Sequence, residues 1–250
     1  MKLIFNADDF GYSKGVNYGI MEAYQNGVVR SATMMAGMIG FDHAVQLAKE
    51  NPGLKIGVHL TLTTGKSVGG IYKTLTDEDG YFLSQKEIEN RANEGKLDLS
   101  EVEEEYEVQI KKITTAGICV DHFDGHHHTQ NLSGVSDIFL KLAKRHRVSV
   151  RFPDKERLCG DYSGIKTTDS FTQSFYGEDV TVKKLMQCIN GCKGESLEIM
   201  CHPAYLDYEL YRGSSYNIRR FYELDVLTGN EIKRYIKENS YILCSFSDLE

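Results

Sequence analysis

Carboxylate and imidazole side chains gather where apolar, strand-like stretches of this 250-residue sequence come to an end. The first stretch runs into Asn-Ala-Asp-Asp, which contains Asp8 and Asp9, and a later stretch holds His59 within Gly-Val-His-Leu-Thr-Leu. Another leads into Asp-His-Phe-Asp-Gly-His-His-His, and a fourth ends in Cys-His-Pro, which contains His202. Catalytic metal sites commonly combine three such side chains with an open position for water. The pattern therefore predicts a divalent metal site.

The histidine-rich stretch offers several donors at alternating positions. In an extended chain, alternation places His122, Asp124, His126 and His128 on one side, with His127 on the other. A histidine that binds a metal needs a partner for its second ring nitrogen, and Asp124 or a carbonyl is expected to orient His126 in this way.

The adjacent carboxylates Asp8 and Asp9 can divide two tasks, because one can bind the metal while the other accepts a proton. Each feature also has a plainer reading on its own: an Asp pair in a solvated turn, a core histidine at position 59, or a surface histidine tract. Four such features at strand ends together favour the site. By contrast, His43 and His146 are expected at the surface with no role.

Short apolar stretches alternate with segments of helical periodicity throughout the chain. Helix-like spacing of apolar residues begins near Phe41, Val102, Val135 and Val182, and a last helix is expected around Glu231–Glu238. The expected strands are Lys2–Asn6, Val28–Met35, Leu54–Leu62, Gly117–Phe123, Val148–Phe152, Leu197–Cys201 and Tyr241–Phe246.

This alternation predicts right-handed βαβ units and a parallel sheet. Periodicity does not distinguish a closed barrel from an open doubly wound sheet. In either fold the carboxyl ends of the strands form the active-site face, so the polar strand ends are expected to meet there.

Three polar segments fit the alternation poorly: Lys66–Leu99, Pro153–Asp179 and Ala204–Leu224. Long irregular insertions in an α/β chain usually lie over the active site. The third segment contains Arg212, Tyr216 and Arg220, which are candidates for substrate binding. Arginine suits bidentate recognition of a phosphate, although these arginines could equally be solvated or bridge a dimer.

Composition limits the remaining classes of function. The length fits one catalytic domain over residues 1–250, and the net charge of -7 comes without a basic run that would indicate nucleic acid or membrane binding. Phosphate-binding glycine loops and a serine-hydrolase elbow are both missing from the sequence. The six cysteines form no zinc-type pair, and most lie in apolar runs that predict burial. With neither a signal peptide nor a membrane-length apolar run, a cytoplasmic protein is expected.

The ordered motifs N-A-D-D-F-G, G-V-H-L-T-L, H-F-D-G-H-H-H and C-H-P-A resemble the YdjC-like carbohydrate deacetylases. They are most like the chitooligosaccharide (chitin disaccharide) deacetylase branch, and the resemblance covers nearly the whole chain. Stretches such as S-F-Y-G at 174–177 and E-L-D-V-L-T at 223–228 support it. Gly125 stands where some relatives have Ser.

The resemblance implies a distorted parallel (β/α) barrel of about seven strands, of the NodB-like type. It implies a metal held by Asp9, His59 and His126, with Asp8 as the catalytic base and His202 as the general acid. The implied metal is Mg²⁺, whereas two imidazoles and one carboxylate suit zinc or another transition metal. Asp124 and His128 are expected next to the ligands.

The resemblance further implies an N-acetylated glucosamine oligosaccharide as substrate, in some cases a phosphorylated one, and a homodimer. Two other classes stay open from the residues: a phosphoesterase on a similar barrel, which would bind more metal ions, and a sugar-binding protein without activity. A glycosidase fits less well because it would need no metal.

Overall fold

The computed structural model describes residues 1–151 and 163–249. Its helices are α1 (Lys14–Gln25), α2 (Phe41–Glu50), α3 (Gln85–Asn93), α4 (Leu99–Thr115), α5 (Val135–His146), α6 (Val182–Asn190), α7 (Tyr208–Gly213), α8 (Ile218–Thr228) and α9 (Asn230–Glu238), with short 3₁₀ turns η1 (His126–Asn131) and η2 (Phe246–Asp248). Its strands are β1 (Lys2–Phe10), β2 (Ser31–Met34), β3 (Lys55–Leu60), β4 (Val120–Gly125), β5 (Ser149–Val150), β6 (Ser170–Thr172), β7 (Ser196–Cys201) and β8 (Ile242–Leu243).

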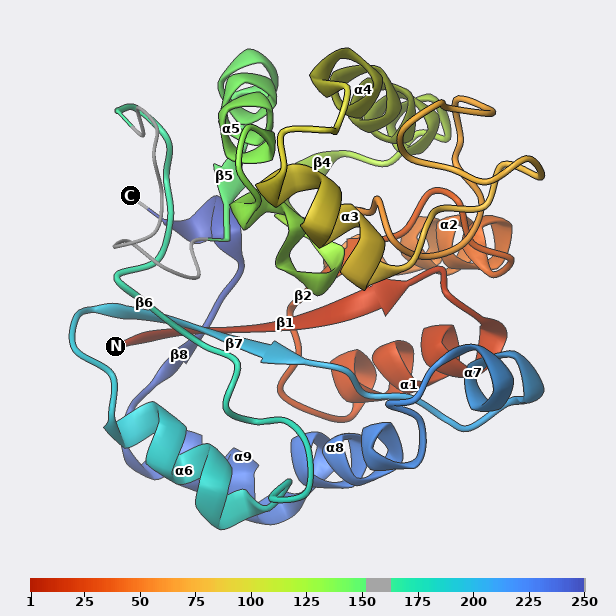
Figure 1. Cartoon of the computed structure of the whole chain (residues 1–250). Helices are drawn as coiled ribbons and strands as arrows, with labels where there is room; N and C mark the ends of the chain where they lie inside the picture. The colour runs from red at the N-terminus through yellow and green to blue at the C-terminus, as the bar shows by residue number, and fades with distance from the viewer. Residues whose placement is uncertain (152–162, 250) are drawn as a thin grey trace.

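The strands form one parallel sheet in the order β5-β4-β3-β2-β1-β7-β6, and β8 pairs with the start of β1. The helices lie outside the curled sheet, and in the view of Figure 1 α4 and α5 lie above it while α6, α8 and α9 lie below it. Within the described ranges, β5 and β6 remain the two edges, so the barrel is open between them. The predicted parallel sheet with outer helices is confirmed. The barrel is also distorted, as expected, because its two described edge strands do not pair with each other.

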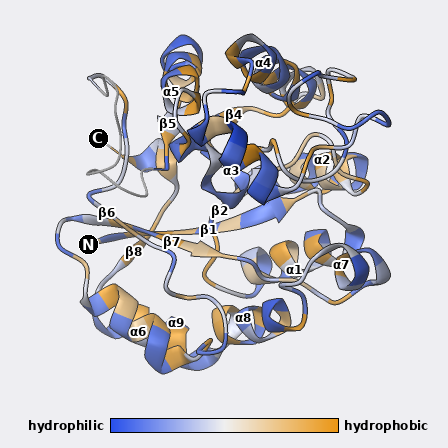
Figure 2. Ribbon diagram, viewed as in Figure 1, coloured by the Kyte–Doolittle hydropathy of each residue, from blue (hydrophilic) through white to orange (hydrophobic). Residues whose placement is uncertain are grey.

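Each amphipathic helix buries one face against the sheet. In α5, Val135, Ile138, Phe139 and Leu142 are all buried, as their spacing predicts. Eight of the nine residues of β1 are buried, because this strand lies in the middle of the sheet. Apolar colour accordingly concentrates in the central strands and on the inner faces of the helices (Figure 2).

The insertions contain more regular structure than the sequence predicts. Segment 66–99 includes α3, segment 153–179 includes the extra strand β6, and segment 204–224 includes α7 and most of α8. These helices were missed because α3 has only two buried residues, Ile88 and Ala92, and α7 has only one, so neither carries a full apolar stripe.

The expectation that most cysteines are buried needs correction. Of the cysteines, Cys201 and Cys244 are buried, but Cys119 is exposed and Cys188 and Cys192 are half-buried; all five are free thiols. Cys159 lies outside the described residues, as do Phe152 of the fifth expected strand and part of the second insertion. Among the described helices, none is both long enough and apolar enough to cross a membrane.

Candidate active site

A cavity of about 690 Å³ opens at the carboxyl ends of the strands. The strand ends contribute Asp8 and Asp9 from β1, His59 from β3 and His202 after β7. All three insertions also reach it, through Gln85, through Gln173 and Tyr176, and through residues 213–216 and Arg220. The expectation that the polar strand ends converge beneath the insertions is therefore confirmed.

Three ligand-type atoms converge in this cavity. Asp9 Oδ1 lies 3.3 Å from His59 Nε2 and 3.1 Å from His126 Nδ1, and the two ring nitrogens are 3.2 Å apart. Zinc bonds nitrogen and oxygen at about 2.0–2.2 Å, which spaces neighbouring ligand atoms about 2.8–3.6 Å apart. Asp9 Oδ1 is buried and accepts no hydrogen bond from the described residues. A divalent cation fits this donor set in both chemistry and spacing.

A bulge in β1 explains how two neighbouring aspartates reach one cavity. Adjacent residues of a regular strand point to opposite faces of the sheet. The pairing of β1 with β2 shifts register between Ala7 and Phe10, and Asp9 has a φ of 70°, in the left-handed region. This local change of direction brings the side chains of Asp8 and Asp9 to the same site.

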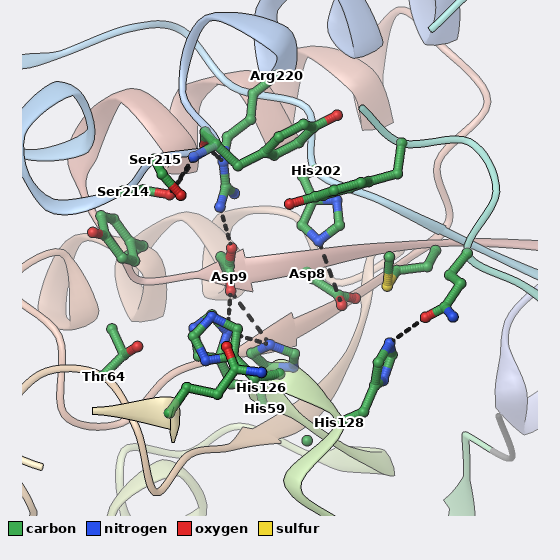
Figure 3. Close-up of a pocket in the computed structure, with 18 of the residues that line it drawn as sticks. Asp8, Asp9, His59, Thr64, His126, His128, His202, Ser214, Ser215 and Arg220 are labelled. Atoms are coloured by element: carbon green, nitrogen blue, oxygen red, sulfur yellow. Dashed lines mark hydrogen bonds and ion pairs between the residues drawn. The ribbon is translucent and has the colours of Figure 1, made fainter. Parts of the chain in front are cut away.

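Arg220 of α8 holds the other oxygen of Asp9. Its Nη2 lies 2.7 Å from Asp9 Oδ2, and its Nε donates to the carbonyl oxygen of Tyr216 at 2.7 Å. In Figure 3, Asp9 lies between Arg220 on one side and His59 and His126 on the other. Although burial opposes ionisation of Asp9, Arg220 and His126 outweigh it and lower its pKa well below the usual value.

Asp124 orients His59, not His126 as expected. Its Oδ1 lies 2.7 Å from His59 Nδ1, which directs Nε2 towards the ligand cluster. Burial opposes the charged form of His59, but the carboxylates of Asp124 and Asp8 prevail and raise its pKa to about 10. For His126, burial prevails and lowers the pKa, which favours the neutral imidazole that binds metals.

The alternation expected for the histidine run ends at Gly125. Residues 126–131 turn into η1, with His127 and His128 at a φ of 53° each. His127 therefore lines the cavity instead of facing away, and its Nδ1 lies 2.9 Å from Thr63 Oγ1. His128 also lines the cavity but bonds Gln173 at 2.6 Å, without contact to the ligands.

Arg151 is a site residue that the sequence analysis missed. It follows β5, is fully buried, and donates to both oxygens of Asp8 at 2.7 Å. It also lies 3.1 Å from Asp124 Oδ2 and 2.7 Å from Glu198 Oε1. A lone arginine in the apolar run Val-Ser-Val-Arg-Phe was the one available signal, since a buried guanidinium requires carboxylate partners.

His202 faces Asp8 across the cavity, with Nε2 3.9 Å from Asp8 Oδ2. Glu223, which was also missed, holds the other side of His202: it accepts from the His202 backbone N–H at 2.5 Å and lies 3.6 Å from Nδ1. The hydroxyl of Tyr216 donates to Glu223 at 2.5 Å, so Tyr216 presents its ring rather than its hydroxyl to the cavity.

Arg212 does not join this site. Its side chain is directed to Tyr208, whose hydroxyl accepts from Nη1 at 2.8 Å, and it is not among the described residues that line the cavity. Arg212 thus lies outside the described lining of the cavity, and its expected role in substrate binding stays a prediction. His43 was expected at the surface with no role. In the structure its Nδ1 lies 3.1 Å from Asn17 Nδ2.

Sequence comparison places this architecture among known proteins. The family profile described as YdjC-like protein matches residues 2–238. A relative from Brevibacillus brevis, named carbohydrate deacetylase, is 44% identical over 255 residues and is covered completely, as is this chain.

Two solved structures extend the comparison. A protein from Enterococcus faecalis, provisionally named for cellobiose-phosphate cleavage, is 33% identical with a TM-score of 0.89, and the match covers 98% of this chain and 97% of that one. The family 4 carbohydrate esterase from Streptomyces lividans, solved with acetate, shares the fold at 10% identity and a TM-score of 0.51, covering 98% and 92%. The latter likeness confirms the expected fold type.

Proposed function

Because the chain belongs to the YdjC-like protein family and is a carbohydrate deacetylase, we propose that it hydrolyses the acetamido group of N-acetylated sugars with one divalent metal ion. The observation that carries this proposal is the convergence of Asp9 Oδ1, His59 Nε2 and His126 Nδ1 within 3.3 Å of one another. Acetate and a free amino sugar are the products. We take residues 1–250 as one catalytic domain.

Asp9, His59 and His126 would hold the ion, which supplies Lewis acidity for the acetyl carbonyl oxygen and for the attacking water. Arg220 occupies the second oxygen of Asp9, so only one oxygen of this carboxylate faces the two imidazoles. Asp124 fixes the ring of His59 in the required orientation.

Asp8 and His202 divide the two proton transfers. Asp8, gripped on both oxygens by Arg151, is positioned to accept a proton from the attacking water. His202 lies across the cavity and gives a proton to the leaving nitrogen. Glu223 accepts from the His202 backbone N–H, and its carboxylate lies 3.6 Å from Nδ1, where it favours a protonated ring.

A phosphoesterase is disfavoured by the position of Arg151. Asp8, His59 and Asp124 form a second group of donor atoms close enough together for a metal. The guanidinium of Arg151 already lies against both Asp8 and Asp124, so a second cation would have to displace a buried positive charge. We therefore expect one metal ion per chain. A sugar-binding protein without activity is disfavoured because the residues that we assign as base, acid and metal ligands all line one cavity.

The ligand types indicate which metal the site prefers, and the cavity lining indicates which substrates to test first. Two imidazoles and one carboxylate favour zinc or a similar transition metal over the Mg²⁺ that the family resemblance implies. Arg220 uses Nη2 for Asp9 and Nε for the Tyr216 carbonyl, and its Nη1 is buried without a hydrogen-bond partner among the described residues. Arg212 bonds Tyr208 outside the described lining, so neither arginine presents an exposed guanidinium to a phosphate in the cavity. We therefore propose unphosphorylated N-acetylglucosamine oligosaccharides as the first substrates to test. The homodimer remains a prediction.

An acetate-release screen tests the proposal. The metal-stripped protein, reloaded separately with Zn²⁺, Co²⁺, Ni²⁺ or Mg²⁺, is assayed on N-acetylglucosamine oligosaccharides with and without a 6-phosphate. We expect metal-dependent acetate release from the unphosphorylated sugars. Phosphate release from sugar phosphates without acetate release would instead support the phosphoesterase.

A further inference from the structure

The leaving-group side of the cavity fixes where the sugar ring must lie. If His202 protonates the leaving nitrogen, as proposed above, that nitrogen lies beside His202 in the cavity. The nitrogen of an acetamido sugar is bonded directly to a carbon of the pyranose ring. The ring must therefore occupy the part of the cavity that adjoins His202.

An aromatic side chain lines this part of the cavity. Tyr176, from the second insertion, has its ring centroid 5.5 Å from that of His202. One face of Tyr176 is covered by Tyr216, at a centroid distance of 3.9 Å and an interplanar angle of 20°. Tyr176 is nevertheless 45% exposed and lines the cavity, so the residue keeps surface that a ligand can contact. None of the steps proposed above uses this surface.

Hydrogen bonds fix the ring that supports Tyr176. The Tyr216 hydroxyl donates to Glu223 and accepts from the backbone N–H of Gly177 at 3.2 Å. Through its hydroxyl, Tyr216 therefore links Gly177, which follows Tyr176, to Glu223. Glu223 also accepts a hydrogen bond from His202. A ring held in place before the substrate arrives loses little conformational entropy on binding.

We propose that Tyr176 is the stacking platform for the pyranose ring that carries the scissile acetamido group. A pyranose has a face of C–H groups and a rim of hydroxyls, and an aromatic ring matches the face while leaving the rim to polar groups such as Gln173. Tyr176 is in this account a specificity-determining residue, and its hydroxyl is not required.

Steady-state kinetics of acetate release on N-acetylglucosamine oligosaccharides test this role. Tyr176→Ala should raise KM about tenfold with kcat changed less than about twofold, the size expected for loss of one aromatic contact. Tyr176→Phe keeps the face and should resemble the wild type. Tyr18→Ala is the control, because Tyr18 is similarly exposed, at 53%, but is not among the described residues that line the cavity.

The same experiment separates the platform from the reaction. Normal acetate release with an unchanged KM in Tyr176→Ala would overturn the platform and leave the deacetylase intact, as would an equal defect in Tyr176→Phe. Absence of acetate release from the metal-loaded wild type would instead overturn the proposed reaction.

A binding measurement gives a second readout. The chain contains no tryptophan, so Tyr176→Trp places a single indole at the platform. In an Asp8→Asn background, N,N′-diacetylchitobiose should change the emission of this indole in a saturable way, whereas the indole of a matched Tyr18→Trp variant should not respond. Saturable sugar binding by calorimetry without any change in the emission of the Tyr176→Trp variant would contradict the proposal.

Discussion

The two walls of the cavity differ in how the fold builds them. The strand-end wall consists of Asp8, Asp9, His59, His126 and His202, all of which are buried. The insertion wall consists of Gln173, Tyr176, Tyr216 and Arg220, and it ranges from the buried Arg220 to the half-exposed Tyr176. The first wall holds the groups that we assign to metal binding and proton transfer. We assign the second wall to sugar binding, and its Arg220 also supports Asp9 of the first.

The two walls differ in how firmly their side chains are positioned. Strand ends are held by the sheet, and their side chains are held again by buried partners such as Arg151 for Asp8 and Asp124 for His59. The insertion wall reaches the metal ligands through few contacts, such as the one between Arg220 and Asp9. Substitutions in the strand-end wall should therefore abolish chemistry, whereas most of those in the insertion wall should change affinity.

The largest effect is expected from the base in the strand-end wall. Asp8→Asn preserves shape but removes the proton acceptor, so kcat should fall by about two or more orders of magnitude while metal content stays at the wild-type level. Asp9→Asn is the matched control and should lose the metal. Metal loss in Asp8→Asn with retention in Asp9→Asn would exchange the roles of the two aspartates.

A second test concerns the acid of the same wall. His202→Ala should retain the metal, lower kcat by about a hundredfold, and remove the alkaline limb of the pH–rate profile, because a general acid must be protonated to act. The profile of kcat against pH for wild type and variant measures this. An unchanged alkaline limb would leave His202 with a structural role only.

Arg220 tests whether the insertion wall acts on the metal. Replacing it with Gln removes the charge that holds Asp9 Oδ2, and metal affinity should fall about 10- to 100-fold, as is usual for groups that orient ligands. Competition with a chromogenic chelator measures this without turnover. An affinity equal to that of the wild type would confine Arg220 to a packing role.

The smallest effect is expected at Arg212. Because its guanidinium is directed to Tyr208, Arg212→Ala should change KM by less than about twofold for both plain and 6-phosphorylated sugars. Parallel kinetics on the two substrates measure it. A selective rise in KM for the phosphorylated sugar would restore Arg212 as a phosphate reader.

The sequence predicted the strand-end wall well because strand direction alone brings Asp9, His59 and His202 to one face. It did not reveal Arg151, whose partner Asp8 is 143 positions away in the chain, or Glu223, whose contact with His202 depends on where the helix α8 packs. It also misjudged the histidine run, since the left-handed backbone at His127 and His128 replaces the alternation of an extended strand.

The sequence predicted the insertion wall only in part. Arg220 and Tyr216 were placed correctly in the cavity, but their contacts were not foreseen, because α8 belongs to a segment with no clear periodicity. Tyr176 carried no signal of its own, since an exposed tyrosine in a polar segment is common.

Metal content per chain tests the central claim most directly. Wild type, His59→Ala and His126→Ala are each loaded with the metal that supports the highest activity, desalted, and analysed by inductively coupled plasma mass spectrometry, with circular dichroism to verify folding. We predict one ion per chain in the wild type and none in either folded variant, with acetate release lost in parallel. An undiminished metal content in either variant, or two ions per wild-type chain, would contradict the site described above.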